Sequence, residues 1–198
     1  MKILEFEQRS PEWFAIRCGK PSASNFDKIV TMDGKPSKQR EKYLYQLAGE
    51  KVSGIAEETY QNAAMLRGIE LEDEARKLYE AITENTVSKV GFCLSDCEEY
   101  GASPDGIVGE KGLLEIKCPA ISTHVCYLLQ NKLPSDYFQQ TQGQLLVTGK
   151  EWVDFVSHYP GIKPLVIRVT RNEEFLSALM SELKSFCKEL NEIVIKIK

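Results

Sequence analysis

The sequence predicts an α/β fold in which helices flank a central mixed β-sheet, built as a single domain over residues 1–198. Hydrophobic residues make up 42% of the chain and charged residues 27%, as in globular proteins with a sizeable core. No tract rich in Gly, Pro or Ser is long enough to be a linker. Helical periodicity on both sides of a strand-like block therefore favours an α/β or α+β sandwich.

Helices dominate the first third of the chain. They are expected over residues 11–17, in a short stretch after Ser22 or Ser24, over 38–53 and over 59–82. Ser10 and Pro11 are typical of an N-cap and a first helical position. Glu72 lies beside the apolar stripe of the last of these helices.

The rest of the chain begins with strands. Strand-like runs fill residues 86–118, separated by turn sequences at 103–106 and at Gly112. After them we expect helices over 122–131 and 135–148, strands over 152–159 and 164–169, and a final helix over 173–196. This order of elements predicts one mixed sheet with helices packed on it.

Charge and hydropathy exclude several classes of protein. The formal charge of −4 and the pI near 5.4 have the wrong sign for a protein that coats nucleic acid non-specifically. Contact with DNA would need a local basic surface or bound cations. No signal-like segment and no run of ~18 apolar residues is present, so we expect a cytoplasmic protein that is neither secreted nor membrane-spanning.

The six cysteines do not form a metal-binding pattern. Only Cys93 and Cys97 are close in sequence, and no second pair completes a tetrahedral thiolate site. Zinc is therefore not expected, and the cysteines are predicted to be buried free thiols.

The segment 103–119 carries the most chemical information. Taken separately, Ser103-Pro-Asp-Gly is a good type I turn, and a Glu-x-Lys on a strand is commonly an exposed ion pair. Taken together, they suit a hairpin with the loop Glu110-Lys111-Gly112, in which Gly112 is left-handed, Gly109 pairs with Leu113 and Asp105 pairs with Lys117. One face of this hairpin then carries Asp105, Ile107, Leu113, Glu115 and Lys117, and the other is apolar or glycine.

Two carboxylates held close together repel each other unless they share a proton or a cation. An oxygen-rich cluster is what Mg²⁺ prefers, and Mn²⁺ can substitute for it. A lysine beside such an ion can orient the attacking water. These are the parts that metal-assisted phosphodiester hydrolysis requires.

The motif Pro104-Asp105, nine residues, then Glu115-Ile116-Lys117 resembles the PD-(D/E)xK nuclease motif. Its flanks, SPDG and LEIKCP, resemble the phage lambda exonuclease branch, the YqaJ-type viral recombinase family. Three further segments resemble motifs of that family in the same order: WFAIRCGKPSAS at 13–24, GIELEDEAR at 68–76 and YFQQTQ at 137–142. The resemblance implies a restriction-endonuclease-like core.

The resemblance also implies roles for single residues. Asp105 and Glu115 would ligate the catalytic metal, with the Ile116 carbonyl as a further ligand, and Lys117 would position water. Glu72 would be a third acidic group and Gln140 would lie near the scissile phosphate. Without the family, Glu72 is a solvated helix charge and Gln140 an ordinary helix residue.

Other residues are implied to bind DNA. Arg17, Ser24 and Ser103 would grip a terminal 5′ phosphate, although Ser24 alone suits a helix cap and Ser103 a turn. Tyr137 lies one turn before Gln140. Met65 is a candidate wedge for splitting the terminal base pair, or else a core residue. The basic stretch 35–42 is a candidate DNA-tracking surface, or else a solvated helix start.

The function that the resemblance implies is a Mg²⁺-dependent 5′→3′ exonuclease that digests one strand of linear duplex DNA and leaves a 3′ single-stranded tail for recombination by annealing. It further implies a ring-shaped homotrimer, DNA ends and a single-strand annealing recombinase as partners, and the cytoplasm of a bacterium or phage-infected host. Two alternatives stay open. One is an endonuclease or resolvase of the same fold, and the other is a non-catalytic DNA-end-binding module.

Overall fold

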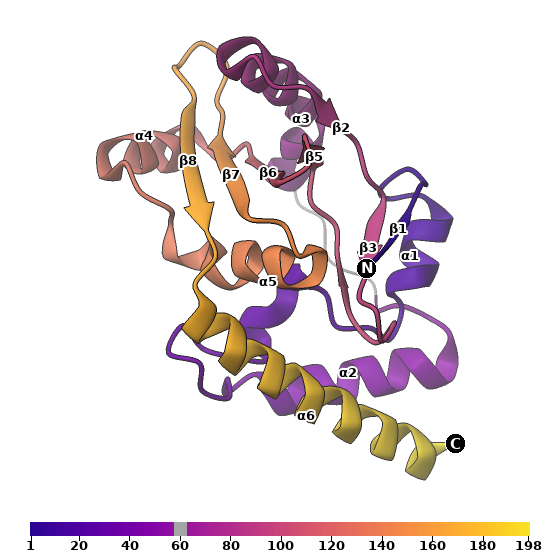
Figure 1. The fold of residues 1–198 in the computed structure, drawn as a ribbon. Coiled ribbons are helices and arrows are strands. Elements are labelled where there is room, and N and C mark those ends of the chain that lie inside the picture. Colours follow the sequence, from indigo (N-terminus) through magenta and orange to yellow (C-terminus); the bar gives the residue numbers. More distant parts are fainter. Residues whose placement is uncertain (58–62) are drawn as a thin grey trace.

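The computed structural model describes residues 1–57 and 63–198, except for the side chains of residues 63–65. A five-stranded mixed sheet in the order β2-β5-β6-β7-β8 forms its centre, and a three-stranded sheet in the order β1-β3-β4 lies beside it (Figure 1). Only β6 and β7 pair in parallel within the larger sheet. The strands are β1 (Lys2–Leu4), β2 (Val87–Ser88), β3 (Phe92–Leu94), β4 (Gly101–Ala102), β5 (Gly106–Val108), β6 (Gly112–Lys117), β7 (Trp152–Ser157) and β8 (Leu165–Thr170).

Helices flank this sheet, as predicted. They are α1 (Pro11–Arg17), α2 (Arg40–Ser53), α3 (Ala63–Thr83), α4 (Ile121–Gln130), α5 (Phe138–Thr148) and α6 (Glu173–Ile197), with short 3-10 helices η1 (Ala23–Lys28) and η2 (Ser135–Tyr137). Ser10 caps α1 by accepting a hydrogen bond from the Trp13 N–H. None of the helices in the described residues is long and apolar enough to cross a membrane.

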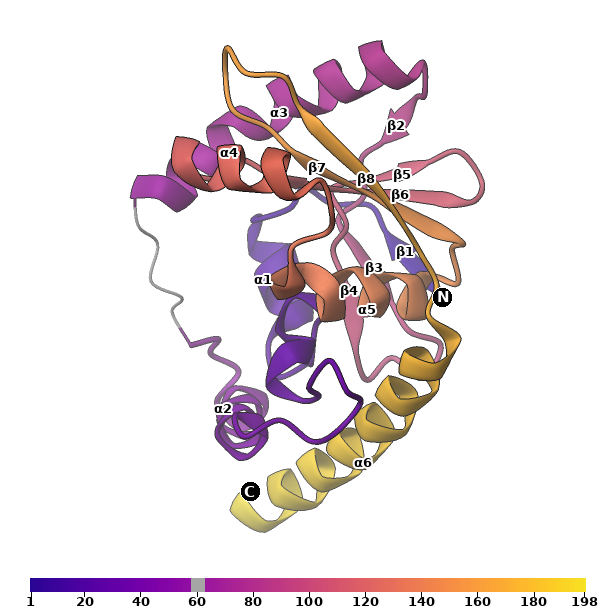
Figure 2. The ribbon, with the colours of Figure 1, turned by 90° about the vertical axis from the view of Figure 1, so that its left-hand side faces the viewer.

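The two faces of the sheet pack on different helices. Figure 2 shows α3 and α5 on opposite sides of the sheet. Leu114 and Ile116 of β6 pack with Ala75 and Tyr79 of α3. Leu113, which directly precedes Leu114, packs with Leu145 of α5. The alternation along β6 thus turns one set of side chains to each helix.

The β5–β6 hairpin corrects the predicted register. Val108 pairs with Gly112 and Gly106 with Leu114, so the pairing of Gly109 with Leu113 and of Asp105 with Lys117 is wrong by two residues. The left-handed residue is Gly109, with φ +55°, and not Gly112. Gly112 lies in the strand, where a Cβ atom would come within 2.2 Å of the Trp152 ring.

A shift of two residues keeps the same side chains on each face, because strand side chains alternate with period two. The predicted sorting of faces therefore holds. What changes is the partner of Asp105, which the observed register places opposite Glu115. The two carboxylates face each other more directly than expected.

One strand and the burial of the cysteines differ from expectation. β1 is not predicted, because a strand of three residues is too short to show periodicity and is defined by its pairing with β3. All six cysteines are free thiols, but the prediction that they are buried holds only for Cys93 and Cys187. Cys18 and Cys118 are half-buried, and Cys97 and Cys126 are exposed.

Candidate active site

The β5–β6 hairpin brings three predicted side chains together. Asp105 directly precedes β5, and Glu115 and Lys117 lie on β6. The Asp105 Oδ2 atom accepts a hydrogen bond of 2.6 Å from the Ile116 N–H, and the Lys117 ammonium donates one to Glu115 Oε1. The Glu115 side chain is only 2% exposed. The result is a group of two carboxylates and one ammonium in which Glu115 is buried and Asp105 and Lys117 are half-buried.

Burial and like charge determine the protonation of this group. Burial raises the pKa of Asp105 well above its ordinary value, and the Glu115 and Glu72 carboxylates raise it further. Burial alone would lower the pKa of Lys117, but attraction to Glu115 and Asp105 outweighs it and the net pKa is raised. Lys117 is therefore protonated. Ionising Asp105 costs free energy unless a further cation binds beside it.

Two glutamines of α5 hold Glu115. Gln140 Nε2 donates to Glu115 Oε1, and Gln144 Nε2, one helical turn later, donates to Oε2, both at 2.5 Å. Gln140 is one of the predicted site residues. Gln144 is not, although it lies four residues after Gln140 and therefore on the same face of a helix. Because both donors are neutral amides, they orient the carboxylate without cancelling its charge.

The Tyr137 ring lies beside Lys117. The Lys117 Nζ atom lies 5.3 Å from the centre of the Tyr137 ring, and that ring packs on Phe155 with centroids 5.0 Å apart. The cation-π contact and the carboxylate together restrict where the ammonium can point.

Glu72 reaches the edge of this group but is engaged in ion pairs. Its Oε1 accepts from Arg76 and its Oε2 from Arg9, each at 3.0 Å. In the described residues no group of three or more His, Cys, Asp or Glu side chains is close enough to hold a metal. The role of Glu72 as a third acidic ligand therefore stays a prediction.

Arg17, Ser24 and Ser103 converge as predicted. The Arg17 guanidinium donates to Ser103 Oγ at 3.3 Å and to Ser24 Oγ at 3.5 Å. Two residues missed from the sequence complete this cluster. Ser22 accepts from Arg17 at 3.1 Å, and Trp13 lies against the guanidinium and donates to Ser103 at 2.9 Å.

The hydrogen-bond partners of the Arg17 guanidinium are uncharged hydroxyl groups. Arg17 forms no ion pair with a carboxylate of the described residues, and burial lowers its pKa to about 10. A half-buried cation surrounded by hydroxyl groups favours an anion as its missing partner. Ser103 immediately precedes Pro104-Asp105, so the anion site adjoins the carboxylates.

The remaining predicted residues are less informative. Met65 belongs to α3, but its side chain lies outside the described residues, so its role as a wedge stays a prediction. Within the basic stretch 35–42, Arg40 forms a two-armed ion pair with Glu189 of α6, at 2.7 and 2.8 Å. Arg40 thus ties helices together, and a DNA-tracking surface there would rest on the lysines.

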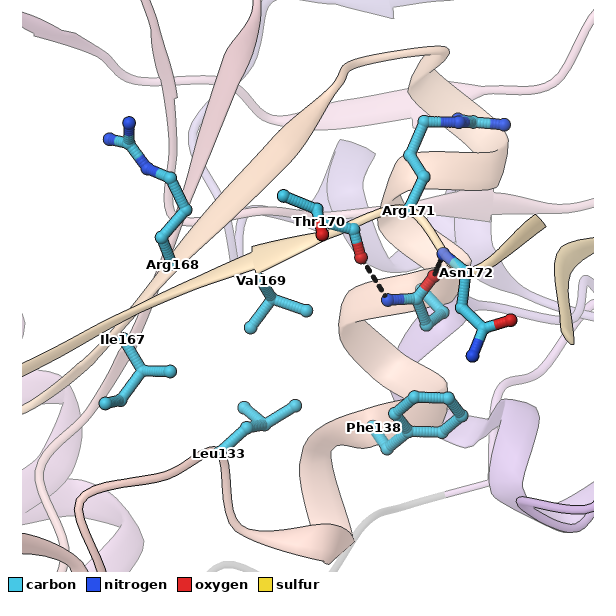
Figure 3. Close-up of a pocket in the computed structure, with 9 residues that line it drawn as sticks. Leu133, Phe138, Ile167, Arg168, Val169, Thr170, Arg171 and Asn172 are labelled. Carbon is cyan, nitrogen blue, oxygen red and sulfur yellow. Dashed lines mark hydrogen bonds between the residues drawn. The ribbon is translucent and has the colours of Figure 1, made fainter.

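A pocket of about 430 Å³ lies between β8 and α5 (Figure 3), and neither Asp105 nor Glu115 lines it. Leu133, Phe138 and Ile167 are among the side chains that line it. Gln142 spans its end, donating to the Thr170 carbonyl and accepting from the Asn172 N–H, both at 2.8 Å. This glutamine of the YFQQTQ segment thus joins α5 to the end of β8.

A family model for the YqaJ-like viral recombinase domain matches residues 12–151. This match covers Asp105, Glu115, Lys117, Tyr137, the two glutamines that hold Glu115, and the Arg17 cluster. The chain belongs to the YqaJ-like viral recombinase family. The family resemblance predicted from the motifs is confirmed, while the single domain over residues 1–198 stays a prediction.

Solved structures agree with this family and with the predicted fold. The chain is similar to an alkaline exonuclease (LHK-Exo) from Laribacter hongkongensis, at 34% identity and a TM-score of 0.87, over 95% of this chain and 96% of that one. The structure of LHK-Exo in complex with dAMP matches with the same identity and TM-score over 96% of each chain. A phage related exonuclease from Haemophilus somnus 129PT, at 16% identity and a TM-score of 0.70 over 90% of this chain and 96% of that one, shares the fold. No curated protein matches the chain.

The matches to the YqaJ-like family and to LHK-Exo support a nuclease of the lambda exonuclease type. They also confirm the mixed α/β sheet with flanking helices. The roles of the individual site residues rest on the geometry above and on the motifs.

Proposed function

We propose that this YqaJ-like protein is a Mg²⁺-dependent 5′→3′ exonuclease that degrades one strand of linear duplex DNA and leaves a 3′ single-stranded tail for recombination by annealing. One observation carries the proposal: the Asp105–Glu115–Lys117 group adjoins an arginine–hydroxyl cluster through the consecutive residues Ser103, Pro104 and Asp105. A hydrolytic centre beside an anion site is what a nuclease that starts from a phosphorylated end requires. The similarity to LHK-Exo supports the same class of enzyme.

The residues present fit a hard divalent cation. Asp105 and Glu115 lie opposite each other, and the pKa of Asp105 is raised first by desolvation and then by the Glu115 carboxylate, so a cation beside them would stabilise the ionised form. Asp105, Glu115 and the Ile116 carbonyl would hold Mg²⁺ or Mn²⁺, because all three offer oxygen. The ion when bound supplies charge neutralisation for the phosphate and its leaving group.

The protein's own side chains position the reactants. Lys117 donates an N–H to the attacking water and aims it at phosphorus, and Glu115 and Tyr137 fix the ammonium for this task. The water oxygen would bond to phosphorus as the bond from phosphorus to the 3′ oxygen breaks, with one water proton released to solvent and the 3′ oxygen protonated from solvent to leave as a hydroxyl group. Gln140 and Gln144 keep Glu115 oriented throughout.

The Arg17 cluster selects the strand end in this proposal. A 5′ phosphate dianion would accept from the guanidinium and from the hydroxyl groups of Ser24 and Ser103, replacing the weak contacts that these groups make with one another. The Ser22 hydroxyl, which accepts from Arg17 at 3.1 Å, lies in the same cluster. The end phosphate would then be anchored next to the carboxylates, which sets the direction of digestion.

Arg17→Ala should strongly slow digestion of 5′-phosphorylated ends and only weakly slow digestion of 5′-hydroxyl ends. The reason is that the guanidinium makes a charge-assisted contact, worth roughly 1.5–3 kcal/mol, that only the phosphorylated end can use. The measurement is the initial rate on matched linear duplexes that differ only at the 5′ group.

Covalently closed circles are the control for end dependence. Wild-type protein should leave them intact at concentrations that digest linear DNA. If circles are cut as fast as linear molecules, or if Arg17→Ala slows both kinds of end equally, the exonuclease proposal fails and the endonuclease alternative replaces it.

Gln144→Leu should raise the Mg²⁺ concentration needed for half-maximal activity and lower stability in EDTA by roughly 1–3 kcal/mol, because it leaves a buried carboxylate oxygen without its donor. A Mg²⁺ titration and urea unfolding measure the two effects. Gln139→Leu is the matched control, since Gln139 lies on the same helix but donates to the Val30 carbonyl. Equal effects of the two variants on the Mg²⁺ requirement would contradict the role of Gln144.

We further propose a ring-shaped homotrimer that encircles DNA, acting with a single-strand annealing recombinase in the cytoplasm of a bacterial or phage-infected cell. The family resemblance supports these proposals. Light scattering of the purified protein should give a mass three times that of one chain, and a monomer mass would reject the ring.

A further inference from the structure

Arg9 adopts a backbone conformation that arginine rarely takes. Its φ is +69°, in the left-handed region that favours glycine. The neighbouring residues hold the chain in this shape. Gln8 donates to the carbonyls of Val90 and Pro104, each at 2.9 Å, and Ser10 caps α1. A strained residue fixed beside the Pro104-Asp105 pair suggests a role in the adjacent site.

The Arg9 side chain is paired with Glu72. Its Nη2 atom lies 3.0 Å from Glu72 Oε2, while the other Glu72 oxygen accepts from Arg76. The two arginines differ in freedom. The Arg76 side chain is 8% exposed and also pairs with Asp73, whereas the Arg9 side chain is 39% exposed and has no second carboxylate among the described residues. The Arg76 side chain is therefore fixed, whereas the Arg9 side chain can rotate away from Glu72 into solvent at a small cost in free energy.

Glu72 is close enough to Asp105 for its charge to act on that carboxyl group. Among the described residues it forms no three-carboxylate group with Asp105 and Glu115, and each of its oxygens accepts from a guanidinium group. Releasing Arg9 would free one oxygen and remove a positive charge from the rim of the site.

We infer that Arg9 is an internal counter-ion that competes with a divalent cation for Glu72, and so acts as a positioning residue that weakens ion binding in the absence of DNA. The inference rests on the ion site of the proposed function. Arg9 touches neither Asp105 nor Glu115 in the described contacts, so it acts through Glu72. Because a half-exposed ion pair is worth at most about a factor of five, the expected effect is of that size.

The test is calorimetric titration of the DNA-free protein with Mn²⁺. Arg9→Gly and Arg9→Ala should each bind Mn²⁺ roughly fivefold more tightly than wild type. In a Glu72→Gln background, Arg9→Gly should have a clearly smaller effect, since the carboxylate over which the two cations compete is gone. Lys111→Ala is the matched control: it removes an exposed positive charge at the opposite end of β6 and should leave Mn²⁺ affinity unchanged.

Urea unfolding in EDTA shows that the variants are folded and separates backbone strain from charge. Arg9→Gly should be more stable than Arg9→Ala, because glycine adopts the positive φ without strain. The two should still share the same Mn²⁺ affinity if the guanidinium is what matters.

The outcomes distinguish this inference from the proposed function. If wild-type protein binds no Mn²⁺, the ion site and the inference fall together. If wild type binds Mn²⁺ but Arg9→Gly and Arg9→Ala bind it equally or more weakly, the inference is overturned and the proposed ion site stands. An undiminished effect in the Glu72→Gln background would also overturn it, since competition would then not involve Glu72.

Discussion

Asp105→Ala should abolish DNA hydrolysis in Mg²⁺ while leaving the protein folded. Asp105 is one of two carboxylates that face each other at the start of β5 and on β6, and removing it leaves too few oxygen ligands for a divalent ion. Glu115→Ala should have the same effect on activity. A time course on 5′-phosphorylated linear duplex measures the loss, and circular dichroism checks the fold. Full activity of Asp105→Ala in Mg²⁺ would reject the catalytic assignment.

The same site predicts how stability depends on pH. Because the pKa of Asp105 is raised in the folded protein, its ionisation opposes folding, and wild type in EDTA should lose stability as the pH rises from the unfolded pKa near ~3.9 toward the folded value. Asp105→Asn should remove this loss, so that the variant is at least as stable as wild type at neutral pH. Thermal unfolding in EDTA across this pH range measures the difference.

Asp154→Asn is the matched control for stability. Asp154 is a buried carboxylate on β7, but Arg168 and Tyr79 donate to it, so its charge is compensated. Removing that charge should lower stability at neutral pH, in contrast to Asp105→Asn. If both variants lose stability alike, the repulsion assigned to the Asp105 site is not present.

Lys117→Ala should slow hydrolysis by roughly 10²- to 10⁴-fold, the range for a positioned acid or base, while still binding DNA in Ca²⁺. The ammonium contacts Glu115 and the Tyr137 ring, which places it at the site without making it a metal ligand. Lys117→Arg should be nearly inactive as well, because the guanidinium is larger and cannot fit the same contacts. Single-turnover rates and DNA binding by anisotropy give the two measurements.

A parallel loss of binding and catalysis would contradict this role for Lys117. The lysine would then be a phosphate contact. Lys150→Ala provides a comparison, since Lys150 is a lysine that donates to the Glu110 carbonyl at the other end of the hairpin. It should change neither the rate nor the binding of DNA appreciably.

Local patterns in the sequence determined most of the elements and the face of the hairpin that carries the chemistry. Helices such as Pro11–Arg17 and Glu173–Ile197 show apolar periodicity and end signals that depend only on near neighbours. Alternation alone put Asp105, Glu115 and Lys117 on one side of the sheet, and an error of two residues in the register did not alter that. The family motifs added Gln140 and the Arg17 cluster.

Tertiary structure decided what depends on residues far apart in the chain. In the observed hairpin register Gly112 lies in β6 against the ring of Trp152, 40 residues later in the chain, and the left-handed glycine is Gly109. Gln144 takes its role only because α5 packs against the face of β6 that carries Glu115. Glu72 is held by Arg9, 63 residues away, in a contact that no local pattern encodes. Contacts between side chains so far apart in the sequence arise when whole helices and strands pack together. The hydrophobic periodicity of a helix or strand shows which face is buried but not which distant residue lies against it.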